Sequence, residues 1–108
     1  MIARVWHGYT RPEHADAYEA MLKPELLPGI GRARGYRGSY LLRRAAADEV
    51  EFITIMLWES IDAIRAVAGP DFEKAIVPEE RRAYLSHFDA ASAHYQVVST
   101  HTPDTIDR

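Results

Sequence analysis

The chain contains no cysteine in its 108 residues. Disulfide bonds, zinc–thiolate sites, iron–sulfur clusters and cysteine nucleophiles are therefore excluded. No apolar run reaches membrane-spanning length, and the first ten residues, MIARVWHGYT, lack the long apolar stretch of a signal peptide. These absences exclude a secreted disulfide scaffold and predict a cytoplasmic protein without a membrane partner.

A large excess of one charge is also missing, because the formal net charge is only −3. The overall acidity disfavours a polyanion partner such as nucleic acid. One cluster of arginines alternates with tyrosines and leucines, as on the wet face and ends of a strand. Its members are Arg32, Arg34, Arg37, Arg43 and Arg44. We therefore expect no nucleic-acid binding.

Sequence fingerprints of metal and nucleotide sites are absent as well. The five histidines are scattered, with no pair four residues apart on a predicted helix. Glycine-rich phosphate-binding motifs and the Gly-x-Ser-x-Gly nucleophile turn do not occur. The sequence thus predicts a protein without a metal site and without a cofactor.

What is present fits one small globular domain. Hydrophobic residues make up 47% of the chain, and its length leaves room for a single core. We expect a domain over residues 1–99 and a polar tail over 100–108. A domain this small buries a modest share of its surface, so self-association would add burial.

Hydrophobic periodicity predicts four strands and two main helices. The clearest signal is the run from Val50 to Trp58, which is apolar on both faces and so is typical of a central, covered strand. Thr10 and Ser60 are predicted helix N-caps, and Gly69-Pro70 a helix stop. Strands are expected near 2–9, 36–44, 50–58 and 93–99, helices after Thr10 and Ser60, and short helical pieces near 71–76 and 78–85.

The order β-α-β-β-α-β predicts an α+β, ferredoxin-like domain. Its four-stranded antiparallel sheet would have the first and third strands in the middle and helices on one face. The other face is too apolar to remain in water. A second copy of the sheet is the simplest cover, so we expect a homodimer.

This order, together with the segments ITIMLWES and HYQVV, resembles the antibiotic biosynthesis monooxygenase superfamily of dimeric α/β barrels. The resemblance covers roughly residues 1–98. It implies a cofactor-independent monooxygenase acting on an aromatic or polyketide-like molecule. Two alternatives on the same fold are a cyclase or isomerase and a non-catalytic ligand-binding or stress-response dimer.

The same resemblance suggests roles for single residues. Trp58 occupies the place of an active-site tryptophan in the quinone-forming oxygenases, and His7 lies near an asparagine of the haem degraders. Thr54 and Ile64 replace an asparagine and a tyrosine of the quinone-forming enzymes. No histidine occurs between His14 and His87, so the haem ligand of the degraders is missing.

Imidazole titrates near neutral pH, so His7 is the predicted general base, with packing against a helix or dimer partner as the alternative. Trp58 could stack on a flat ligand or anchor the sheet to the second helix. If the first and third strands run parallel, both side chains would reach an apolar cavity beneath the helices. Val5, His7 and Tyr9 would then share the helix-facing surface with Phe52, Thr54, Met56 and Trp58. The predicted catalytic residues are His7, Trp58 and His87, and the predicted ligand contacts are Tyr9, Tyr18, Leu22, Thr54, Met56 and Phe88.

Overall fold

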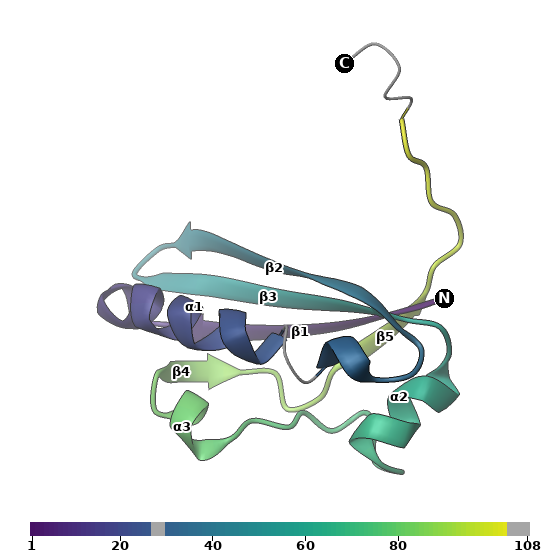
Figure 1. Cartoon of the computed structure of the whole chain (residues 1–108). Helices are drawn as coiled ribbons and strands as arrows, with labels where there is room; N and C mark the ends of the chain where they lie inside the picture. Colours follow the sequence, from purple (N-terminus) through teal and green to yellow (C-terminus); the bar gives the residue numbers. More distant parts are fainter. Residues whose placement is uncertain (27–29, 104–108) are drawn as a thin grey trace.

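A computed structural model describes residues 1–26 and 30–103 as an antiparallel sheet with its helices on one side (Figure 1). The fold is α+β and ferredoxin-like, as the element order predicts. None of the helices in the described ranges is long and apolar enough to cross a membrane. The elements are β1 (Ile2–Thr10), α1 (Pro12–Leu26), a 3-10 helix (Ile30–Arg32), β2 (Tyr36–Ala46), β3 (Glu49–Trp58), α2 (Ile61–Ala68), α3 (Glu79–Arg82), β4 (Leu85–Phe88) and β5 (Ala93–Gln96).

The sheet order is β2-β3-β1-β4, with β5 also paired to β1. This confirms that the first and third strands are central. They are adjacent but antiparallel, with Ile2 opposite Trp58 and His7 opposite Ile53. The assumption of parallel strands is therefore wrong, and His7 and Trp58 lie toward opposite ends of the β1–β3 ladder.

The last edge of the sheet is divided into two short strands. β4 pairs with Gly8–Thr10 of β1 and β5 with Ile2–Val5, so the intervening chain leaves the ladder. The residues between β4 and β5 pair instead with the segment after α2, where the backbone N–H of Ser92 donates to the carbonyl of Glu73 (2.7 Å). The sheet thus has five strands rather than four.

This detour corrects three sequence expectations. The segment near 71–76 forms turns and a bridge from Lys74 to Ala91 rather than a helix. The helix expected at 78–85 covers only Glu79–Arg82, and the following residues form β4. The last strand ends at Gln96 rather than near residue 99.

Register decides which side chains face the helices. Residues directly opposite one another in an antiparallel ladder share a face. Val50, Phe52 and Trp58 of β3 are buried, so the even-numbered residues of β1 and β3 face the helices. His7 and Tyr9 consequently lie on the other surface, which we call the open face. The predicted grouping of His7 with Phe52 and Trp58 is wrong.

The core on the helix side consists of two buried clusters. Beneath α1, Ala15, Tyr18 and Leu22 pack with Val50 and Phe52 of β3. At the other end of β3, Trp58 and Ile64 of α2 are buried, and the Tyr36 ring meets Trp58 edge-on at 5.4 Å. The predicted cap of α2 is confirmed, since the Ala63 N–H donates to Ser60 Oγ (3.1 Å). The two helices thus anchor different ends of one sheet.

Candidate functional site

Between the two clusters, the helix-facing surface is incompletely covered. Trp6 of β1 and Thr54 and Met56 of β3 point to this side by register, yet all three are only partly buried. A protein interior normally packs without such openings. We call this region the middle surface, and its aromatic and thioether groups suit an apolar ligand.

Trp6 is held flat at the edge of the middle surface. Its indole N–H donates to the carbonyl of Asp89 (2.8 Å), and its ring centre lies 5.8 Å from that of Phe88. A Cβ added at Gly8 would come within 2.9 Å of the Trp6 ring. Glycine at position 8 is therefore what lets the indole lie close to the strand.

Arg4 lies at the other side of the middle surface, opposite Met56 and His94. Its Nη1 donates to the Phe72 carbonyl and contacts His94 Nε2 at 2.8 Å. The Phe72 ring meets the imidazole edge-on. Burial, and secondarily the charge of Arg4, lower the pKa of His94, while Glu73 opposes the shift.

Trp58 is 2% exposed, and its Nε1 is buried without a hydrogen-bond partner among the described residues. A buried N–H that lacks an acceptor is destabilising and unusual. The predicted anchoring of sheet to helix accounts for the ring but not for this donor. Stacking of Trp58 on a ligand stays a prediction.

The open face has a polar end that contains a histidine–aspartate pair. His7 Nδ1 lies 2.8 Å from Asp89 Oδ2, in the break between β4 and β5. The proton on Nδ1 then faces the carboxylate, and Nε2 is left as the basic atom. This arrangement could accept a proton from a ligand on the open face.

A row of ionisable side chains crosses the sheet beside this pair. Tyr9 stacks on His87 with ring centres 4.1 Å apart and donates to Glu51 (3.3 Å), which also accepts from Arg44 Nε (2.6 Å). Partial burial, and then Glu51, raise the pKa of Tyr9, while the bond from Arg44 lowers the pKa of Glu51. His87 contacts Glu49 at 3.0 Å and lowers the pKa of that carboxyl.

The structure therefore divides the predicted site between two surfaces. His7, Tyr9 and His87 come together on the open face. Thr54, Met56 and Phe88 border the middle surface, with Trp58 buried beyond it, whereas Tyr18 and Leu22 are packed in the α1 cluster. The expectation that one cavity holds both His7 and Trp58 is wrong.

Sequence reasoning missed the roles of Arg4, Asp89 and His94. Asp89 becomes a partner of His7 only because the sheet edge is broken between β4 and β5, and no local sequence pattern predicts this break. Register places His94 beside Arg4 on the helix side and its neighbour Tyr95 on the open face. The alternation of strand residues could have paired Arg4 with His94 once the register was known.

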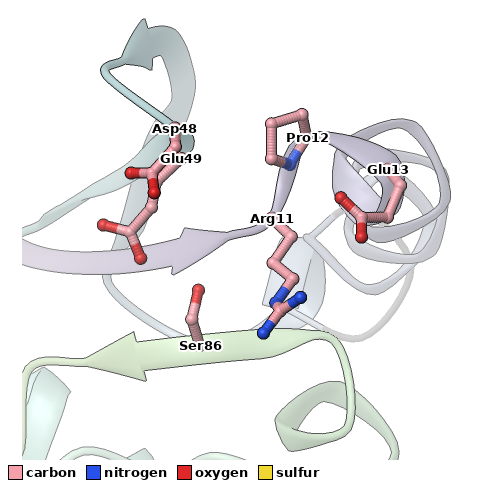
Figure 2. A pocket seen from close by; sticks show the side chains of 6 residues that line it. All are labelled: Arg11, Pro12, Glu13, Asp48, Glu49 and Ser86. Atoms are coloured by element: carbon pink, nitrogen blue, oxygen red, sulfur yellow. The ribbon is translucent and has the colours of Figure 1, made fainter.

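Several hollows lie away from the middle surface. One, of about 510 Å³, sits at the end of the sheet, where charged side chains from the start of α1 and the β2–β3 turn surround Ser86 (Figure 2). It is lined by Arg11, Pro12, Glu13, Asp48, Glu49 and Ser86. A smaller one of about 260 Å³ lies over the paired strands β2 and β3, lined by Leu42, Arg43, Arg44, Glu51 and Ile53. Across the described ranges, no group of three or more histidines and carboxylates could hold a metal ion.

The chain matches no protein-family model and no curated protein sequence. Solved structures do resemble it over nearly its whole length. A protein described as an antibiotic biosynthesis monooxygenase from Bacillus cereus has a TM-score of 0.67 at 15% identity, with 97% of this chain and 98% of that chain covered. The N63A mutant of SnoaB, a cofactor-independent oxygenase from Streptomyces nogalater, has a TM-score of 0.63 at 20% identity, covering 92% and 94%. The heme-degrader MhuD from Mycobacterium tuberculosis has a TM-score of 0.61 at 19% identity, covering 94% and 100%.

These likenesses establish the class of fold, a ferredoxin-like α+β domain. More particularly, the chain has the fold of the antibiotic biosynthesis monooxygenases, as the sequence resemblance implies. At these identities the likeness concerns the fold, and activity has to be argued from this chain's own residues.

Proposed function

We propose that the protein is a homodimeric, cofactor-independent monooxygenase that acts on a flat aromatic molecule bound at the middle surface. The observation that carries the proposal is the incomplete cover over Trp6, Thr54 and Met56, between two buried clusters. The shared fold with SnoaB supports the oxygenase reading.

The chemistry suits a substrate with a CH₂ group between an aromatic ring and a carbonyl or second ring. Loss of a proton gives a carbanion that transfers its electrons to O₂ and forms a C–O bond. The O–O bond then breaks, water leaves, and the CH₂ carbon becomes a carbonyl. The substrate carbon supplies all four electrons that O₂ accepts, so no external reductant is required.

Five of the six predicted ligand contacts have a place in this proposal, whereas Tyr9 lies on the open face. Met56 and Phe88 offer apolar surface to the rings, and Thr54 offers a hydroxyl in the centre. Trp6 would stack against the ligand from the β1 side. Tyr18 and Leu22 would act indirectly, by fixing α1 over the sheet.

Anthrone provides the test, because its conversion to anthraquinone consumes one O₂ and releases one water. We expect oxygen uptake and quinone absorbance to rise together, at a rate that a metal chelator leaves unchanged. Trp6→Ala should weaken anthrone binding, while Val67→Ala on the outer side of α2 should not. Absence of both binding and turnover would contradict the proposal.

The position of His7 specifically favours a second candidate, a non-catalytic ligand-binding dimer. His7 is on the open face and cannot take a proton from a ligand at the middle surface. Anthrone binding without oxygen uptake would favour this candidate. Isomerisation or ring closure of a test ligand without oxygen uptake would instead favour the cyclase or isomerase.

The homodimer is proposed from the open face. Several large apolar side chains there are strongly exposed, including Tyr40 (61%), Leu42 (44%) and Tyr95 (58%). A two-fold axis would place each such patch against its own copy, so one surface would cover both. His7 and His87 would then face the space between the two sheets.

A further inference from the structure

We propose that Arg4 and His94 bind an oxyanion, a carboxylate or a phenolate, carried by the aromatic ligand. The inference deepens the proposed function and rests on it for the aromatic part of the ligand. It identifies the substrate as acidic and assigns its anionic group to the Arg4 side of the middle surface.

Arg4 is a partly buried positive charge without a carboxylate partner. Its two hydrogen bonds, to the Phe72 carbonyl and to His94, both use Nη1. No carboxylate lies within ion-pair distance of it among the described residues, and its Nε and Nη2 find no acceptor there. A charge removed from water without a partner is destabilising, so such a group is expected to have a role.

The contrast with other arginines makes this clear. The strand arginines Arg43 and Arg44 are exposed, yet Arg43 pairs with Asp16 and Glu19 and Arg44 with Glu51. Arg4 is more buried than either of them but has no such pair. The missing counter-charge can come from a ligand.

The two groups that accept from Arg4, the Phe72 carbonyl and His94 Nε2, are both occupied by its Nη1. Since a guanidinium can only donate, His94 Nε2 must accept, and the proton of the neutral ring lies on Nδ1. Its lowered pKa keeps the ring neutral at pH 7.

A second arginine, Arg65 of α2, lies near the Phe72 segment, and its own charge is paired with Asp62 at 3.0 Å. The Arg65 guanidinium lies 5.3 Å from the Phe72 ring centre, above the same segment. Glu73 is near enough to act on His94 but forms no ion pair with Arg4. Donors around a positive charge, with the acceptors already used, match an oxyanion rather than a cation or a neutral amide.

This arrangement also bears on the proposed reaction. A guanidinium beside a phenol or enol favours its ionised form and lowers its pKa. The substrate would lose its proton to solvent water and reach its reactive, electron-rich state without a protein base at the middle surface. This resolves the difficulty that His7 lies on the wrong side of the sheet.

A pair of isosteric probes tests the inference. 2-Naphthoate and 2-naphthamide have the same shape, but only the first carries a charge. We expect the wild-type protein to bind naphthoate roughly tenfold to a hundredfold more tightly by calorimetry, the range given by a charge-assisted hydrogen bond. Arg4→Gln should abolish this preference while leaving naphthamide affinity within about threefold.

Three variants keep the test independent of folding. Arg32→Gln removes the same charge from the exposed 3-10 helix and should leave the preference intact. Arg4→Lys should retain part of it, and His94→Gln should reduce it, with each melting temperature recorded. Retention of the full preference in Arg4→Gln would overturn the inference.

The outcomes separate the two proposals. Equal binding of both probes by the wild-type protein would overturn the oxyanion site alone. Failure of both to bind would overturn the aromatic site, and the oxyanion site with it. 2-Naphthol distinguishes a phenolate site from a carboxylate site. A phenolate absorbance band that appears at lower pH with wild type than with Arg4→Gln would identify a phenolate site. Preference for naphthoate alone would identify a carboxylate site.

Discussion

Asp89 forms hydrogen bonds with His7 through both its backbone and its side chain. The Asp89 N–H donates to the His7 carbonyl (2.9 Å), and Asp89 Oδ2 accepts from the His7 backbone N–H (3.1 Å) while lying 2.8 Å from Nδ1. The carboxylate thus takes the place of a neighbouring strand where the edge is broken. Backbone groups in a sheet need such partners, which explains how the break is tolerated.

Asp89→Ala should therefore destabilise the protein. The His7 N–H would lose its acceptor, and we expect the free energy of unfolding to fall by about 1–3 kcal/mol, the range for an unsatisfied polar group. Urea denaturation measures the change. Asp71→Ala, in the exposed turn after α2, is the matched control and should shift the midpoint little; equal losses in both variants would contradict the bridging role.

His7→Ala should change turnover of a middle-surface substrate by less than about threefold. The imidazole faces away from that substrate, so its loss removes no proton acceptor from it. Steady-state oxygen uptake gives the measurement. A fall of roughly 10²–10⁴-fold, the usual contribution of a general base, would instead mean that the substrate binds on the open face.

Element order and local signals predicted much of the fold. The cap at Ser60 and the strand ending at Trp58 could be read directly, because both depend on neighbouring residues. The antiparallel arrangement of β1 and β3 also follows from the order, since the β2–β3 hairpin reverses the chain. The sequence alone does not show which alternate residues of β1 face the helices, because this depends on the register between strands. A shift of one residue would exchange the faces of His7 and Trp6.

Gly8→Ala should destabilise the protein by about 1–3 kcal/mol, as expected for overpacking. The new Cβ would meet the Trp6 ring at 2.9 Å and Leu85 at 3.1 Å, so the indole must move and loosen its bond to the Asp89 carbonyl. Thermal melts followed by tryptophan fluorescence report both effects. Gly31→Ala, where a Cβ meets nothing within 4 Å, should melt close to wild type.

Leu42→Lys should convert the proposed dimer into a monomer. The substitution places a charge in the apolar part of the open face, where desolvation would oppose self-association. Light scattering at micromolar concentration should give about twice the chain mass for wild type and the single mass for the variant. Val67→Lys alters an equally exposed apolar residue on α2 and should remain dimeric; a monomeric wild type would refute the assembly.

The lowered pKa of His94 predicts a loss of stability in mild acid. The unfolded chain binds a proton near pH 6.5, whereas the folded chain resists it, so the free energy of unfolding should fall as pH drops below about 6.5 until the folded pKa is reached. His94→Gln should flatten this part of the curve in urea titrations. Carboxyls with lowered pKa, such as Glu49 and Glu51, change the free energy of unfolding only below about pH 4.5, outside this pH range. An unchanged slope in the His94→Gln variant would rule out His94 as the cause.

The division of the core into two clusters places separate groups of apolar contacts at the two ends of one sheet, which β1, β2 and β3 connect. α2 contributes a single buried residue, Ile64, whereas α1 contributes three among its described side chains, at positions 12–23. Local opening requires less free energy where fewer apolar contacts are lost, so the α2 end can open while the α1 end stays closed. A ligand that filled the middle surface would join the two clusters into one, and opening of α2 would then become part of global unfolding.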